Sequence, residues 1–512
     1  MIFVYHINNK ISSVHSQEGT AIECDVKVSI AKGLNQLANR YPSEIIVWCH
    51  LDFKVSLNTE VLPALFHHNK LLLSYRPSLS NFINEAIGYV DDSLFVNVNK
   101  KVSYPSWQMS SIVGMVHASV LIAIGDTIPF DTDFDYYLNS VAKLAMPLGL
   151  LCYSEPQLLK NAGISNISTS SHYTLFKFVK QHYRTRWVFL LFLNLLIYEK
   201  RLVLLPFLTS FCFRKRNSSF SLEGVKVVSS KEVIDEPTID VIIPTIGRKP
   251  YLYDVLKDLA KQIVLPKKVV IVEQNPDVAS SSELDYLESE FWPFQIKHIF
   301  THQAGACNAR NLALDAVESD WVFLADDDIV FETDFFKKSF QTILEFDIKA
   351  VSVSCLREGE KSNIKNIIQW RSFGSGCSIV ATSILKQSKF NVGYEFGFGE
   401  DFDFGMQIRN LGQDIIYLPE PHILHLKAPI GGFRTKAVLK WQKDNIQPKP
   451  SPTVMLSCIL HKTSKQQLGY KTTLFFKYFK HQKIKNPIRY LVSFRKQWNQ
   501  SVFWANQLNQ KQ

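Results

Sequence analysis

Residues 321–330 read Trp-Val-Phe-Leu-Ala-Asp-Asp-Asp-Ile-Val, an apolar run that ends in three carboxylates. A strand without polar residues is typical of a parallel α/β sheet covered on both faces, and ligands of such sheets bind beyond the carboxyl ends of the strands. In an extended chain Asp326 and Asp328 face one side and Asp327 the other. Crowded anions repel one another unless a cation compensates, and carboxylate oxygens suit Mg²⁺ or Mn²⁺. The segment predicts a cation site at a sheet edge, and a solvated acidic loop is the alternative.

The residues around this strand alternate between strand and helix patterns, beginning at Thr238. Ile239–Pro244 and Val269–Glu273 are apolar runs of strand length, whereas Leu252–Leu259 and Asn308–Val317 have helical spacing. Alternation of this kind predicts a Rossmann-related α/β domain with a mixed, mostly parallel sheet.

A second acidic cluster, Glu400-Asp401, follows a glycine-rich turn and precedes a predicted helix. Transfer of a group to a hydroxyl requires a base that takes the proton, and a carboxylate at a helix N-terminus stays ionised. Asp401 is the predicted base, and Glu400 is predicted to hold an acceptor hydroxyl. The alternative is that these acids only cap the helix.

The segment Glu420–Arg434 adds an imidazole, two cations and a glycine pair shortly after these acids. His425 is a candidate third metal ligand beside Asp328, because imidazole suits Mn²⁺ better than Mg²⁺, although a lone histidine is usually structural. Lys427 and Arg434 are predicted to stabilise the charge of a leaving diphosphate.

Four motifs in this order resemble the family 2 glycosyltransferases of GT-A fold over about 200 residues. The motifs are Val241-Ile-Ile-Pro244-Thr245, Gly305-Ala-Cys-Asn-Ala-Arg310-Asn311, Asp326-Asp327-Asp328 and Glu400-Asp401. The resemblance implies an inverting, single-displacement transfer from a nucleotide-diphosphate sugar, with Mn²⁺ or Mg²⁺ as the cofactor.

The resemblance also implies the roles of single residues. Asp328 and Asp326 are expected at the metal, Asp401 is expected to be the base, and the nucleotide is expected to contact Pro244, Thr245, Glu273, Arg310, Asn311 and Asp326. One departure is Glu273-Gln274-Asn275, where the family commonly has an aspartate after the second strand. This difference leaves the nucleotide open.

The two halves of the chain share short similarities in the same order, which predicts two copies of one fold. The matched pairs are Tyr41–Val47 with Leu265–Ile271, Trp107 and Gly114 with Trp370 and Gly376, Phe130–Asp135 with Phe398–Asp403, and Glu155-Pro156 with Glu420-Pro421.

The N-terminal copy lacks the acidic triplet in both registers that the sequence allows, Tyr75–Pro77 and Asp91–Ser93, and neither ends in aspartate. Its Thr132-Asp133 pair retains one acid of the predicted base motif. We expect a degenerate domain for acceptor binding, assembly or scaffolding.

The length of 512 residues predicts two or three structural units. We expect a degenerate domain at 1–170, an apolar and basic helical connector at 171–236, a catalytic domain at 237–434 and a basic helical extension at 435–512. The eight scattered cysteines are typical of reduced thiols in a cytosolic protein. The first ten residues are typical of a strand and not of a signal peptide.

Basic and apolar residues gather in two segments. From residue 434 onward the chain has sixteen Lys or Arg and one acid, with aromatic residues between them, a combination that suits an anionic membrane surface. The alternatives are a tail folded on the protein and a contact with nucleic acid. Nucleic acid is not expected as a partner, because nothing in the sequence resembles a nucleic-acid-binding fold. Trp187–Phe213 is interrupted by charges, which predicts two short helices, in the membrane plane or packed between domains.

These patterns together predict an enzyme of cell-surface polysaccharide or lipopolysaccharide assembly. It would act in the cytoplasm, peripheral to the inner face of the cell membrane, on a glycan or lipid-linked acceptor. A sugar nucleotidyltransferase and a non-catalytic carbohydrate-binding scaffold are the competing hypotheses.

Overall fold

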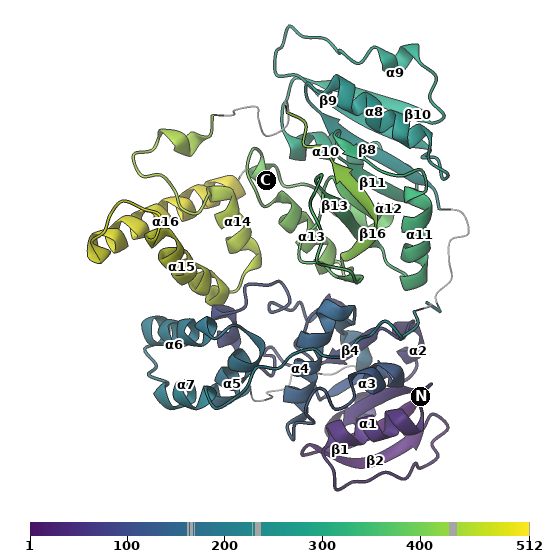
Figure 1. Cartoon of the computed structure of the whole chain (residues 1–512), viewed down its shortest axis with the longest axis vertical. Coiled ribbons are helices and arrows are strands. Elements are labelled where there is room, and N and C mark those ends of the chain that lie inside the picture. Colours follow the sequence, from purple (N-terminus) through teal and green to yellow (C-terminus); the bar gives the residue numbers. More distant parts are fainter. Residues whose placement is uncertain are drawn as a thin grey trace. The chain divides into compact units, whose positions relative to one another are not determined.

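The computed structural model describes the chain except for residues 161, 162, 164–166, 168, 228, 231–236, 430–437 and 511–512. The chain forms two compact units (Figure 1). Unit 1 comprises Met1–Lys231 and Lys462–Lys480, and unit 2 comprises Glu232–His461 and His481–Gln512. The basic C-terminal segment is therefore shared between the units, while the four predicted segment boundaries stay predictions.

Unit 2 is built on a nine-stranded sheet in the order β10-β9-β8-β11-β15-β13-β16-β12, with β14 paired to β16. Its strands are β8 (Ile239–Thr245), β9 (Lys268–Gln274), β10 (Gln295–Thr301), β11 (Trp321–Ala325), β12 (Ile329–Val330), β13 (Ala350–Leu356), β14 (Ile368–Gln369), β15 (Cys377–Ala381) and β16 (Ile416–His425). The strands from β10 to β11 are parallel, whereas β15 runs antiparallel to β11 and β13. The sheet is mixed, as predicted: β13 and β16 pair in parallel, and β15, β12 and β14 pair antiparallel with their neighbours.

The helices of unit 2 are α8 (Lys249–Ala260), α9 (Tyr286–Ser289), α10 (Ala306–Leu314), α11 (Phe335–Phe346), α12 (Thr382–Leu385), α13 (Glu400–Asn410), α14 (Pro452–His461) and α16 (Pro487–Asn509). Of these, α8, α10, α11 and α12 pack on strands of the sheet, whereas α14 and α16 pack against each other. In α8 the residues Leu252, Val255, Leu256 and Leu259 are buried, at the spacing of one helix face. All five residues of β11 are buried, as its apolar sequence predicts.

Unit 1 contains a seven-stranded sheet in the order β2-β1-β3-β6-β4-β7-β5. Its strands are β1 (Ile2–Ile7), β2 (Lys10–Ser16), β3 (Ile45–His50), β4 (Leu71–Tyr75), β5 (Tyr104–Pro105), β6 (Val113–His117) and β7 (Leu151–Ser154). Its helices are α1 (Ile30–Arg40), α2 (Leu62–Leu65), α3 (Ala118–Ile124), α4 (Phe134–Ala145), α5 (His172–His182), α6 (Arg186–Glu199), α7 (Leu204–Ser210) and α15 (Ser464–Phe479).

The central strands of the two sheets are paired in the same way. The order β1-β3-β6-β4-β7-β5 has the same sequence of parallel and antiparallel pairings as β8-β11-β15-β13-β16-β14. Two hydrogen bonds from backbone N–H groups recur in both sheets and align unit 1 with unit 2. The bond from His50 N to Ile112 O (2.7 Å) corresponds to the bond from Asp326 N to Gly376 O (3.3 Å). The bond from Ser110 N to Ser74 Oγ (3.0 Å) corresponds to the bond from Gly374 N to Ser352 Oγ (3.2 Å). In this register β3 corresponds to β11, so the sequence match of Tyr41–Val47 with the β9 region is wrong.

The apolar segment of unit 1 forms the two short helices α6 and α7, which pack with α5 (Figure 1). Among the residues that the structure describes, no helix has both the length and the apolar character needed to cross a membrane.

Candidate active site

Unit 2 has a cavity of about 490 Å³ at the carboxyl ends of β8 and β11, within the usual size of small-molecule sites. It is closed by the segment before β15, the start of α13 and the end of β16. Nine residues singled out from the sequence line it: Pro244, Thr245, Arg310, Asp326, Asp328, Glu400, Asp401, His425 and Lys427. The structure therefore brings together residues from four separate motifs.

Two other predicted site residues, Glu273 and Asn311, are held by neighbouring groups and do not line the cavity. The Glu273 carboxylate accepts hydrogen bonds from Ser282 Oγ (2.6 Å) and Glu283 N (3.0 Å) and contacts His298 Nε2 (2.9 Å), and it is Gln274 that lines the cavity. Asn311 Nδ2 donates a hydrogen bond to Phe390 O, and Phe390 N–H donates one to Asn311 Oδ1, each at 2.8 Å. Arg434 lies outside the described residues.

The three aspartates after β11 point in different directions, as the alternation of an extended chain predicts. Asp327 is buried and accepts hydrogen bonds from Thr245 Oγ1 (2.7 Å) and Arg248 Nη1 (2.6 Å). Asp326 lies on the other side, where its Oδ1 is 3.2 Å from Arg310 Nη2. Asp327 thus anchors the turn through Thr245 and Arg248, and all three aspartates line the cavity.

Asp326, Asp328 and His425 could hold a divalent cation. Each offers one ligand atom, and these atoms all lie within 4.8 Å of one another. Asp328 Oδ2 accepts a hydrogen bond from Ala428 N (2.8 Å), while its buried Oδ1 lies 3.3 Å from His425 Nε2 and has no well-formed hydrogen bond among the described residues. Two carboxylates and an imidazole, with one buried oxygen still open, fit Mn²⁺ or Mg²⁺.

The charges around Asp328 and His425 shift the pKa values of both side chains. The Asp328 carboxylate, 3.3 Å from Nε2, raises the pKa of His425. Burial favours the neutral form of Asp328, but His425, the Ala428 backbone amide and Arg248 outweigh it and lower the pKa of Asp328. A ligand carboxylate that stays ionised is what a metal site requires.

Arg248 is a site residue that the motif comparison did not select. Its Nη1 lies 2.6 Å from Asp327 Oδ1 and 3.2 Å from Asp328 Oδ2, so one guanidinium contacts two of the three carboxylates. Burial is the main cause that raises the pKa of Asp327 to about 6, and Arg248 opposes this shift. The signal in the sequence was a basic residue directly after the first strand of the domain.

Glu400 and Asp401 begin α13 and both face the cavity. The backbone N–H of Ser375 donates to Asp401 Oδ1 (3.2 Å), which fixes this carboxylate beside the segment that precedes β15. Burial raises the pKa of Asp401, against the charge of Arg310. Burial and the neighbouring Asp401 raise the pKa of Glu400 to about 7.

Two glycines allow close packing at the edge of the cavity. A Cβ atom on Gly376 would lie 2.2 Å from Asp326 Oδ2, so this position has no room for a side chain. A Cβ atom on Gly305 would lie 2.4 Å from Glu395 Oε1, and Glu395 in turn accepts a hydrogen bond from Asn308 N (2.7 Å) in the first turn of α10. Glu395, like Ser375, has no signal in the sequence, because its role depends on packing between distant segments.

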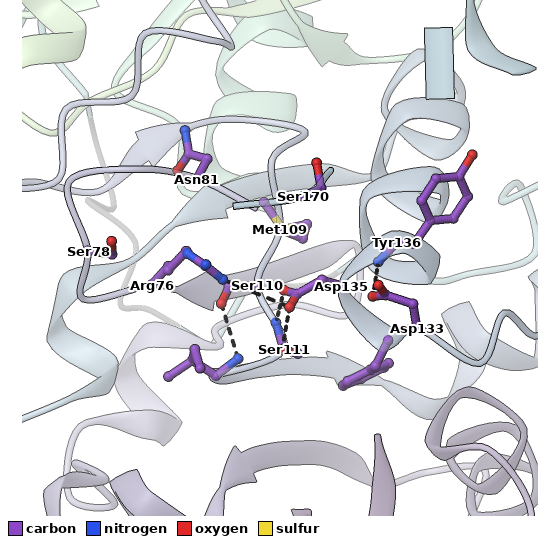
Figure 2. Close-up of polar contacts among 12 residues, drawn as sticks. Arg76, Ser78, Asn81, Met109, Ser110, Ser111, Asp133, Asp135, Tyr136 and Ser170 are labelled. Carbon is purple, nitrogen blue, oxygen red and sulfur yellow. Dashed lines mark hydrogen bonds and ion pairs between the residues drawn. The ribbon is translucent and has the colours of Figure 1, made fainter. Parts of the chain in front are cut away.

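Unit 1 has a carboxylate in the position that corresponds to Asp401. Ser111 donates to Asp135 from both its backbone N–H and its hydroxyl, each at 2.8 Å, and Arg76 lies 3.9 Å from the same carboxylate (Figure 2). Asp133 instead caps α4 by accepting a hydrogen bond from Tyr136 N (3.0 Å). The sequence match of Asp133 with Asp401 is therefore wrong by two residues, and Asp135 is the equivalent acid.

The acidic triplet has no full counterpart in unit 1. Because β3 corresponds to β11, the residues that correspond to Asp326, Asp327 and Asp328 are His50, the last residue of β3, and then Leu51 and Asp52. The expectation that no aspartate ends this turn is wrong, yet the side chain of Asp52 is 73% exposed and its described ion pair is with His50. Phe134 stands where unit 2 has Glu400.

Residues 240–398 match the model of the family described as Glycosyl transferase family 2. The matched segment is about a third of the chain, and it includes the triplet after β11 but ends before Glu400. This match supports a family 2 glycosyltransferase domain in unit 2, and with it a transferase that uses a nucleotide sugar. No curated protein matches the chain.

Solved structures that resemble the chain include S. aureus TarS residues 1–349, with 22% identity over 37% of this chain and 60% of that one, and a TM-score of 0.32. The same protein in complex with UDP-GlcNAc has 19% identity over 45% and 69%, with a TM-score of 0.34. GalNAc-T7 with UDP, GalNAc and Mn²⁺ has 11% identity over 38% and 44%, with a TM-score of 0.32. The chain thus spans less than two thirds of the first of these structures, and similarity at this level supports no inference about activity.

Proposed function

We propose that unit 2 is a metal-dependent, inverting glycosyltransferase. It would move a sugar from a nucleotide-diphosphate donor to a hydroxyl of a growing glycan or lipid-linked acceptor. The observation that carries the proposal is that the Asp326, Asp328 and His425 group and the Glu400-Asp401 pair line one cavity, within a unit that matches a glycosyltransferase family.

In this proposal Asp326, Asp328 and His425 hold the divalent cation, which would supply a Lewis acid for the charge of the donor diphosphate. Lys427 and Arg310, which line the same cavity, add positive charge on the donor side. Arg248 stays on Asp327 and Asp328 and keeps the acidic turn in place when the donor leaves.

The acceptor hydroxyl attacks the anomeric carbon from the face opposite the diphosphate, so one carbon–oxygen bond forms while the bond to the leaving diphosphate oxygen breaks. Asp401 takes the hydroxyl proton, and the hydrogen bond from Ser375 orients its carboxylate. Glu400, next to it on α13, holds the acceptor by a further hydroxyl.

The position of the donor base follows from the first two strands. Pro244 and Thr245 line the cavity together with Gln274, so we propose that the base lies against these residues. Glu273 and Asn311 would then act indirectly, since each is held by neighbouring protein groups.

We propose that unit 1 is a degenerate GT-A-like copy without donor chemistry. The shared strand pairing and the shared contact of Asp135 and Asp401 with the preceding loop support a common origin of the two sheets. The residues His50-Leu51-Asp52 at the end of β3 support the absence of a comparable metal group from the part of unit 1 that the structure describes. Acceptor binding, assembly or scaffolding are the roles that fit such a unit.

The proposed setting is cell-surface polysaccharide assembly in the cytoplasm, at the inner face of the membrane. A screen of nucleotide-diphosphate sugars for Mn²⁺-stimulated hydrolysis by the purified full chain tests the donor part. We expect one donor class to be hydrolysed and the activity to disappear with EDTA. Release of pyrophosphate from a nucleoside triphosphate and a sugar phosphate, without donor hydrolysis, would instead indicate a nucleotidyltransferase.

A further inference from the structure

The helices α6 and α7 of unit 1 carry an unusual concentration of exposed apolar side chains. We propose that their outward side, here called the hairpin face, docks in the plane of an anionic lipid bilayer. The hairpin face consists of Phe189, Leu196, Ile197, Leu202, Leu204, Leu205, Leu208 and Phe211, all of them exposed within 23 residues.

The inward side of the two helices packs against other side chains of unit 1. Phe207 of α7 packs against Phe176 of α5 and against Phe189 and Phe192 of α6, with ring centroids 4.8–6.3 Å apart. Thr472 of α15 donates a hydrogen bond to Asn194 of α6 (2.6 Å). The hairpin is therefore fixed in unit 1, with Leu191 and Leu195 of α6 buried on its inner side.

A surface of this kind is costly in water. Leu205 and Leu208 are 65% and 51% exposed and lie about one helical turn apart, and Phe211 follows Leu208 by about another turn. Contiguous exposed apolar patches mark interaction sites, whereas isolated exposed side chains do not. The hairpin face thus requires a partner that takes apolar side chains.

The charges around the hairpin face identify the chemistry of that partner. Between residues 184 and 215 the chain has six Lys or Arg and a single carboxylate, Glu199. Glu199 is held within unit 1 by Lys465 and by the hydroxyl of Tyr89 (3.2 Å), so it adds little negative charge to the surface. Basic residues beside an apolar helical face are the pattern of a helix that lies in the interface of an anionic membrane.

The geometry favours lying on the bilayer over crossing it. The helix α6 has 14 residues and α7 has 7, and Lys200 and Arg201 separate them, so neither reaches the length of about 20 residues that a spanning helix needs. Arg184 precedes α6 and Arg186 is its first residue, and Arg214 and Lys215 follow α7. These positions place cations at the ends of both apolar helices, where lipid headgroups would meet them.

The basic C-terminal segment is a weaker candidate for the same contact. Its helix α16 buries Tyr490, Phe494 and Trp498 in unit 2, so most of its aromatic stripe is used in packing. Ile488 and Val492 remain exposed near the start of α16. They provide the comparison that separates the two surfaces.

The docking proposal rests on the proposed function in one respect: a lipid-linked acceptor would explain why the protein docks on a membrane. The test of docking uses no substrate. Purified full chain is floated with vesicles of phosphatidylcholine alone and with an equimolar mixture of phosphatidylcholine and phosphatidylglycerol. Leu205→Glu/Leu208→Glu removes the centre of the hairpin face, and Arg214→Gln/Lys215→Gln removes flanking charge. Val55→Glu/Val278→Glu adds the same charge at positions that are 100% and 82% exposed elsewhere.

We expect the wild type to float with the anionic vesicles and much less with neutral ones. The leucine double variant should bind at least about tenfold more weakly, the cation variant should lose several-fold, and the control should match the wild type. Far-ultraviolet circular dichroism confirms that each variant is folded, and Mn²⁺-stimulated donor hydrolysis without vesicles should be unchanged in all of them. Equal flotation of Leu205→Glu/Leu208→Glu and wild type would overturn the proposal, as would absence of wild-type binding or loss of binding only in Ile488→Glu/Val492→Glu.

Discussion

The two equivalent aspartates of the chain provide a matched pair of substitutions. Asp401→Asn removes the proposed base but keeps an oxygen that accepts the hydrogen bond of Ser375 N–H. A positioned general base contributes roughly 10²–10⁴-fold to a rate, which corresponds to about 3–5 kcal/mol of activation free energy. We therefore expect kcat to fall by about 10²-fold or more, with little change in the free energy of unfolding, because the shape of the side chain is retained.

The control is Asp135→Asn, in which the same bond from Ser111 N–H and the hydroxyl bond can both be kept. We expect this variant to transfer sugar at the wild-type rate, because unit 1 lacks the metal group. Transfer to the acceptor is measured with the donor that the hydrolysis screen identifies, at saturating donor, and urea unfolding is measured for both variants. Equal losses in the two variants, or a normal kcat in Asp401→Asn, would refute the assignment of the base.

Three further substitutions test single contacts. Gly376→Ala places a Cβ 2.2 Å from Asp326 Oδ2, so it should weaken Mn²⁺ binding by about tenfold or more, as measured by calorimetry. Burial raises the pKa of Glu400 from 4.5 to about 7, so the native state binds this proton more tightly than the unfolded chain does. The unfolding free energy of the wild type should therefore fall as the pH rises through that interval. Glu400→Gln should weaken this pH dependence in urea unfolding, and an unchanged dependence of the unfolding free energy on pH would contradict the assignment. Arg409→Met leaves the buried Asp414 without its ion pair of 3.2 Å and should cost about 3 kcal/mol of unfolding free energy, whereas a loss below about 1 kcal/mol would mean that Asp414 is otherwise compensated.

The parts of the fold that follow from local pattern were predictable. The apolar run at 321–325 defines β11 to the residue, because burial on both faces leaves a direct trace in the sequence. The apolar spacing of Leu252–Leu259 identifies α8, although the helix begins three residues earlier, at Lys249. The antiparallel insertion of β15 left no such trace. Its residues are as apolar as those of a parallel strand, and direction is decided by pairing with distant segments.

The candidate site was predictable where chemistry concentrates polar residues at strand ends. Asp326, Asp328, Asp401 and His425 all reach the cavity, although they are separated by up to 100 residues. Glu395 was not predictable, because its bonds to the start of α10 depend on tertiary packing. The register of the internal repeat failed for a similar reason, since short sequence matches cannot distinguish a shift of two residues that backbone contacts resolve.

The most direct test of the central claim is Mn²⁺ binding to the wild type and to Asp328→Ala, measured together with donor hydrolysis in the same samples. Asp328 is buried and contributes the open oxygen of the proposed cation group. We expect one Mn²⁺ per chain in the wild type, and in Asp328→Ala a loss of Mn²⁺ affinity by about 100-fold with a matching loss of hydrolysis. Unchanged Mn²⁺-stimulated hydrolysis in a folded Asp328→Ala protein would contradict the proposed site.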